Sequence, residues 1–182
     1  MTIEHLKDMA QKALEHGIES MREKGDLHMM FHLIRRDGGH EIIMCAEDVT
    51  NSEEAKSQLG RGIRARVQAG ELEAVILVSD SYIAETTREQ DAVRRAFRMT
   101  IEECWKAGMM PKREAVMVSL DSALYSQTVT QEYKRIDGGR AVELVGAPVC
   151  LPSTPGANGV SGAFGGRFMG LFKGTMQGEG RA

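Results

Sequence analysis

One stretch of the chain, Leu72 to Ser79, is an almost unbroken run of apolar residues. A short run of this kind, rich in valine and isoleucine, is typical of a β-strand that is covered on both faces. We therefore place this strand in the centre of a β-sheet, and the rest of the fold has to be built around it.

Two predicted hairpins flank this central strand along the chain. The segment Leu27 to Ile34 alternates two sets of side chains and is followed, after Asp37-Gly38-Gly39, by Glu41 to Ala46. The same turn sequence returns as Asp137-Gly138-Gly139 before the segment Arg140 to Val149. Glycine accepts the positive φ angles that tight turns require, so both segments are predicted to be β-hairpins.

Three segments have the apolar spacing of amphipathic helices, with residues that favour helix ends at their borders. A capping-box spacing of Asn51 and Glu54 indicates the start of the second helix, and the third is expected to turn Val93 and Phe97 inward. The predicted helices run from Ile3 to Gly25, from Asn51 to Ala69 and from Thr86 or Thr87 to Gly108.

Two further strands, Glu114 to Leu120 and Leu124 to Ile136, complete the order αββαβαβββ. This order predicts an α+β domain: a mixed, largely antiparallel sheet of about six strands with three helices packed on it. The domain is expected to cover residues 1–151, and a chain of this size needs no metal or disulfide to fold. Residues 152–182 form a separate glycine-rich C-terminal tail in this prediction.

The tail contains a repeat of four residues, Gly-x-Φ-x, in which Φ is phenylalanine or methionine. As an α-helix it would carry glycines on one side and apolar side chains on the other. Each interior glycine costs about 1 kcal/mol relative to alanine, so such a helix would need something to bind. The residues of this predicted interaction tail are Gly162, Phe164, Gly166, Phe168, Gly170, Phe172, Gly174, Met176 and Gly178.

Other conformations of the tail are also open. Small residues four apart allow close helix association at a membrane surface, and Arg167 and Lys173 favour an interfacial position over a membrane span. An extended tail could instead add to a sheet edge, and a disordered tail would leave the repeat without meaning. If the repeat is functional, deletion of residues 156–182 is expected to leave the body folded and to abolish assembly or partner binding.

Familiar site motifs are incomplete in this sequence. His28 and His32 are four residues apart, but on a strand that spacing is about 13 Å, too far for one zinc ion to bridge. The segment Gly60 to Ala65 resembles a dinucleotide-binding motif but lies inside a predicted helix. We therefore expect no cofactor and no metal.

We interpret the chain as a non-enzymatic interaction or assembly component of prokaryotic or viral origin, which uses the tail to contact itself or another protein. The alternative is a small enzyme or ligand-binding domain with a site near the strand ends at Asp80, Tyr82 and Asp121. Nucleic-acid binding through arginines of the second and third helices is weaker, because acidic neighbours and a net charge of -3 oppose it.

The expected location is the cytoplasm. The N-terminal residues show no secretory signal, and the longest uncharged stretch, Leu144 to Gly166, is interrupted by prolines and cannot span a membrane as a helix. Cys45, Cys104 and Cys150 are an odd number without a close pair, which indicates reduced and individually buried thiols.

Overall fold

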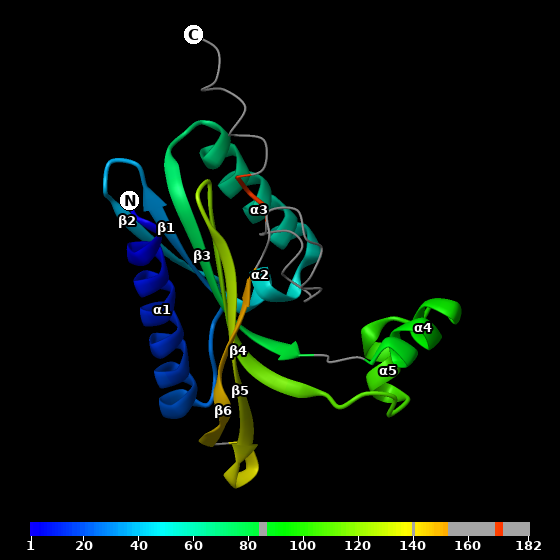
Figure 1. Cartoon of the computed structure of the whole chain (residues 1–182). Coiled ribbons are helices and arrows are strands. Elements are labelled where there is room, and N and C mark those ends of the chain that lie inside the picture. The colour runs from blue at the N-terminus through cyan, green and yellow to red at the C-terminus, as the bar shows by residue number, and fades with distance from the viewer. Residues whose placement is uncertain (84–86, 140, 153–169, 173–182) are drawn as a thin grey trace.

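The computed structural model describes residues 1–83, 87–139, 141–152 and 170–172 (Figure 1). Six strands form one sheet in the order β2-β1-β3-β4-β5-β6, and each neighbouring pair is antiparallel. The α+β class is therefore confirmed. The strands are β1 (Met30–Arg35), β2 (His40–Met44), β3 (Leu72–Ile83), β4 (Arg113–Ser122), β5 (Ser126–Ile136) and β6 (Ala141–Pro152).

Helices cover both faces of the sheet. The helix α1 (Ile3–Lys24) packs on one face, the α1 face, where Leu14, Ile76 and Val118 are fully buried. The helix α3 (Glu53–Gln68) follows the short helix α2 (Glu47–Asn51) and packs on the other face, the α3 face, around Phe31 and Leu77. The predicted central strand is β3, which contributes apolar side chains to both clusters and is buried from both sides as expected.

The ends of the packed helices follow local capping rules. The Thr2 hydroxyl accepts the backbone N–H of His5 at the start of α1, and Gly25 ends the helix with a φ of +68°. The predicted cap of the second helix was wrong by one residue. Ser52 caps α3 by accepting the N–H of Ala55, because Asn51 is already part of α2.

The predicted third helix is two short helices, α4 (Arg88–Ala96) and α5 (Ile101–Lys106), which project from the body between the end of β3 and the start of β4 (Figure 1). Arg98 has a φ of +54°, which ends the helical path, and Thr100 starts a new capping box. Val93 and Phe97 were expected to point inward, but they are 41% and 75% exposed. Only α1 and α3 therefore act as the covering helices that the sequence pattern predicted.

Both predicted hairpin turns are confirmed. Gly38 has a φ of +85° between β1 and β2, and Gly138 and Gly139 have φ angles of +68° and +92° between β5 and β6. Cys45 and Cys104 are buried as expected, but Cys150 is exposed on the edge strand β6. Among the described residues, none of the helices combines the length and apolar character that crossing a membrane requires.

Candidate functional site

The buried carboxylate of Asp121 lies at the centre of the candidate functional site. Asp121 lies on the α3 face of β4, opposite Val75 and Ser126 in the sheet register, and is only 5% exposed. The Ser126 hydroxyl donates to Asp121 Oδ1 at 2.5 Å, and the backbone N–H of Leu171 donates to Asp121 Oδ2 at 2.5 Å. A strand of the body thus holds a segment of the tail.

Two opposing effects act on the pKa of Asp121. Burial raises the pKa because it disfavours the charged carboxylate. Hydrogen bonds from Ser126 and from the backbone N–H groups of Leu171, Phe172 and Gly170 lower the pKa, although burial has the largest effect. The backbone of the tail therefore supplies much of the polar environment that a buried carboxylate requires.

The conformation of Gly170 explains why successive backbone groups can reach one carboxylate. Gly170 has a φ of +68°, a left-handed conformation that glycine adopts without strain, and the next two residues form a turn. Successive N–H groups in such a turn converge on one side and make a concave binding site for an anion. In this protein the anion is a side chain of the same chain.

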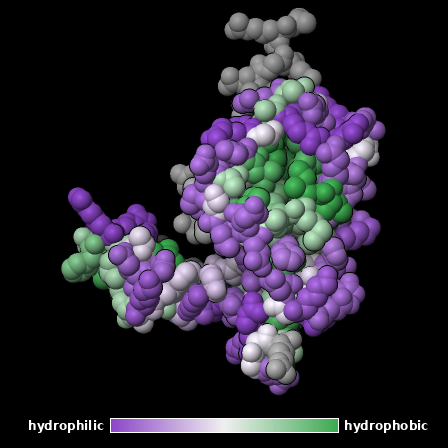
Figure 2. Space-filling model, turned by 180° about the vertical axis from the view of Figure 1, so that it is seen from behind, coloured by the Kyte–Doolittle hydropathy of each residue, from purple (hydrophilic) through white to green (hydrophobic). Residues whose placement is uncertain are grey.

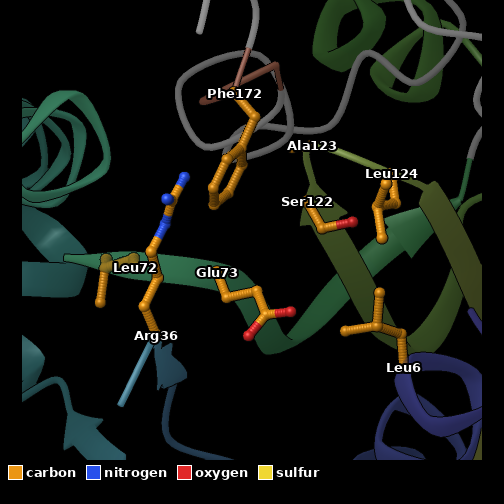
Figure 3. A pocket seen from close by; sticks show the side chains of 8 residues that line it. All are labelled: Leu6, Arg36, Leu72, Glu73, Ser122, Ala123, Leu124 and Phe172. Carbon is orange, nitrogen blue, oxygen red and sulfur yellow. The ribbon is translucent and has the colours of Figure 1, made fainter. Parts of the chain in front are cut away.

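Apolar contacts complete the docking of this segment. Leu171 and Phe172 are 2% and 6% exposed and belong to the buried cluster on the α3 face. Figure 3 shows the Phe172 ring pointing into a pocket of about 300 Å³. We call Asp121, Ser126 and the apolar residues around Leu171 and Phe172 the tail-docking site. The pocket beside it is lined by Leu6, Arg36, Leu72, Glu73, Ser122, Ala123, Leu124 and Phe172.

The structure thus shows where two of the predicted tail residues lie. Gly170 and Phe172 are held against the body, in a turn and not in a regular helix or strand. Leu171 and Phe172 are part of a buried cluster, so we now expect a body without residues 156–182 to fold with lower stability. The remaining predicted tail residues lie outside the described residues: Gly162, Phe164, Gly166, Phe168, Gly174, Met176 and Gly178.

The structure does not bring Asp80 and Asp121 together. Val116 is the register partner of Asp80, whereas Val75 is the partner of Asp121. The two carboxylates are therefore five residues apart along β3, about 17 Å, and point to opposite faces of the sheet. The alternative site near the strand ends, with Tyr82 as a third member, is not formed by the described residues.

Asp80 belongs instead to a polar network on the α1 face. The Tyr133 hydroxyl donates to Asp80 Oδ1 at 2.7 Å, and Arg135 contacts Asp80 Oδ2 at 3.2 Å and donates to the carbonyl oxygen of Gly25 at 2.7 Å. Burial raises the pKa of Asp80, and burial together with the Asp80 hydrogen bond raises the pKa of Tyr133. These contacts tie β3 and β5 to the end of α1, which gives Asp80 a structural role.

Four of the five histidines line one pocket of about 310 Å³ between α1 and the first hairpin. The pair considered from sequence spacing, His28 and His32, does not meet there. His32 Nδ1 lies 3.1 Å from His40 Nε2, whereas His28 is exposed and does not line this pocket. Burial, followed by the neighbouring His40 and His16, lowers the pKa of His32 to about 4. Within the described ranges, no three potential ligand side chains are arranged to hold a metal ion.

The arginines considered for nucleic-acid binding do not form one surface. The helices α3 and α4 lie apart in Figure 1, so their arginines are separated. Arg66 of α3 is also engaged within the protein, since it contacts Glu41 at 2.9 Å and Glu71 at 3.0 Å. Comparison of the chain with protein-family models, curated proteins and solved structures found no match.

Sequence reasoning missed the role of Asp121 because the predicted strand ended at Leu120, whereas β4 continues to Ser122. Val116, Val118 and Leu120 face α1, while Ser119 and Asp121 face the other side of the sheet. Polar residues on one face of an antiparallel strand usually indicate that this face is exposed to solvent. Both polar residues are nevertheless buried. Two features of the sequence together could have indicated the docking site. One is this polar strand face, and the other is the apolar repeat of the tail, for which the sequence showed no surface to pack against.

Proposed function

We propose that the protein is a non-enzymatic assembly component, in which the tail-docking site of one copy also receives the segment Gly170 to Phe172 of another copy. The observation that carries this proposal is the buried Asp121 carboxylate with the Leu171 N–H bound to it at 2.5 Å. A buried carboxylate matched to consecutive backbone groups is a specific recognition device for a short peptide segment.

The length of chain before the segment supports exchange between copies. Pro152 pairs with Gln127, which is next to Ser126, so the end of β6 lies about 10 Å from Asp121. Seventeen residues, 153–169, connect this point to Gly170. A chain of this length can reach up to about 60 Å, far more than docking within one copy needs. The same contacts can therefore form between copies by exchange of the segment.

A complementation experiment tests this proposal. One full-length variant, Asp121→Leu, has a defective site and an intact segment, and the other, Leu171→Ala with Phe172→Ala, has an intact site and a defective segment. Neither variant can dock its own tail, but the segment of the first can dock on the second. We expect the mixed pair to associate about tenfold more tightly than either variant with itself, a difference of about 1.4 kcal/mol.

Labelling at the exposed Cys150 provides the readout, because energy transfer between donor-labelled and acceptor-labelled chains reports association directly. Mixtures of donor-labelled and acceptor-labelled chains of the same variant serve as controls, because they measure any association that does not depend on the tail. Circular dichroism of each variant checks that it is folded. Equal energy transfer in mixed and self-mixed samples would overturn the proposed exchange.

A further inference from the structure

The two edges of the sheet differ in how they are protected against pairing with another strand. The edge strand β6 contains Pro148, and Gly146 has a φ of +66° where the register with β5 shifts. Prolines and bulges of this kind prevent another strand from adding to an edge. The opposite edge strand, β2, has the sequence His-Glu-Ile-Ile-Met and pairs regularly with β1, without proline, lysine or a bulge over its described length.

The hydrogen bonds of the first hairpin show which residues of β2 face the open edge. The N–H of Cys45 donates to the Met29 carbonyl oxygen, and the N–H of Arg35 donates to the Gly39 carbonyl oxygen, each at 2.8 Å. The backbone groups of successive residues in an antiparallel ladder point to alternate sides of the strand. The N–H and carbonyl groups of the odd-numbered residues of β2 therefore point toward β1. The N–H and carbonyl groups of the even-numbered residues therefore face outward: His40, Ile42 and Met44.

The same strand exposes large apolar side chains. Ile42 is 55% exposed and Met44 is 64% exposed, and both lie on the α1 face beyond the cover of α1. Figure 2, which shows the molecule from behind, has one broad apolar patch bordered by hydrophilic residues. Patches of this kind on a soluble domain are typical of interaction surfaces.

We infer that two copies of this chain pair through β2 in an antiparallel register about a two-fold axis at Ile42. In this register Ile42 exchanges both backbone hydrogen bonds with the partner's Ile42, and His40 does so with the partner's Met44. All three outward-facing residues then find partners, and the two sheets become one continuous sheet. The inference rests on residues other than the tail-docking site and goes beyond the proposed function.

The charges at the two ends of the β2 edge fit a second copy. At one end, Arg35 at the end of β1 forms an ion pair with Asp37 of the hairpin turn, so Arg36 gives this end its net positive charge. The first turn of α2 at the other end carries Glu47 and Asp48. Antiparallel pairing about a two-fold axis places the turn with its net positive charge beside the acidic turn of the partner. Glu41 on the α3 face does not oppose pairing, because Arg66 contacts its carboxylate at 2.9 Å.

A charge-swap experiment on the full chain tests both the interface and its register. Ile42→Lys places two introduced lysines directly opposite each other across the axis, and Ile42→Glu does the same with two glutamates, so each variant should dissociate. We expect each to weaken the dimer about 100-fold, which corresponds to about 2.7 kcal/mol. The equimolar mixture should form a heterodimer, because the introduced lysine then faces the partner's introduced glutamate. Sedimentation equilibrium over a concentration series measures these masses.

Two controls separate this interface from other contacts. Val149→Lys makes the same change on the other edge strand, where Val149 is 53% exposed, and should leave the dimer intact. The variant Leu171→Ala with Phe172→Ala should also remain a β2 dimer, so tail docking and edge pairing can fail independently. A dissociation constant of about 1 mM corresponds to weak binding. A wild-type chain that stays monomeric even at this concentration would overturn the inference. Failure of the lysine and glutamate variants to pair with each other would also overturn it.

Discussion

Replacing Leu171 and Phe172 together by alanine is expected to lower the free energy of unfolding by about 4–6 kcal/mol. Single substitutions of buried leucine and phenylalanine by alanine each cost about 2–5 kcal/mol, and two neighbouring losses add incompletely. The two side chains are 2% and 6% exposed within the cluster on the α3 face, so their loss uncovers apolar surface of β3. Urea denaturation followed by circular dichroism measures the effect.

The matched control for this prediction is Phe97→Ala. Phe97 is 75% exposed at the end of α4, so its truncation should change the free energy of unfolding by less than about 0.5 kcal/mol. If the double variant were as stable as this control, the tail segment would contribute nothing to the body. The docking contacts described above would then be absent from the protein in solution.

The second large effect is expected at Gly17, where α1 crosses β3 and β4. A Cβ atom at this position would lie 2.9 Å from Val116 Cγ1 and 3.1 Å from Val78 Cγ1. Neither valine can move aside easily, because both are fully buried in the sheet. Gly17→Val should therefore push α1 away from the sheet and lower the free energy of unfolding by about 3–4 kcal/mol, slightly beyond the usual cost of overpacking.

A pair of alanine substitutions gives this prediction an internal control of opposite sign. Gly62 lies within α3, and a Cβ atom there would meet nothing within 4 Å. Gly62→Ala should raise the free energy of unfolding by about 0.5–1 kcal/mol through helix propensity alone. Gly17→Ala should lower it by about 1–2 kcal/mol, because the steric cost exceeds the same gain. Equal effects of the two substitutions in thermal denaturation would show that α1 does not approach the sheet as closely as described.

Much of the fold follows from local patterns in the sequence. The unbroken apolar run predicted the central position of β3, and the two Asp-Gly-Gly turns predicted the hairpins, because these signals depend on burial and backbone geometry at neighbouring positions. The segment that became α4 and α5 has a helical period too. Its expected inward face, with Val93 and Phe97, is exposed because α4 and α5 project from the body and do not pack on the sheet.

The site was harder to predict because it depends on pairings between distant residues. The interpretation of Asp80 and Asp121 as one cleft required the ends of β3 and β4 to lie together, as they do in parallel sheets. The two strands are antiparallel, so their carboxyl ends lie at opposite edges of the molecule along the strand direction. The contact between Asp121 and Leu171 joins residues that are 50 positions apart, and local spacing does not reveal a contact of that range.

The central claim is that the tail segment docks on Asp121, and amide hydrogen exchange of the full chain measured by NMR tests it most directly. The backbone N–H of Leu171 should exchange at least about 100-fold more slowly than in an unstructured peptide, because it is buried and bound to the carboxylate. Asp121→Leu should remove this protection while the amides of β3 stay protected. Exchange of the Leu171 amide at the unstructured rate in the wild-type chain would contradict the account.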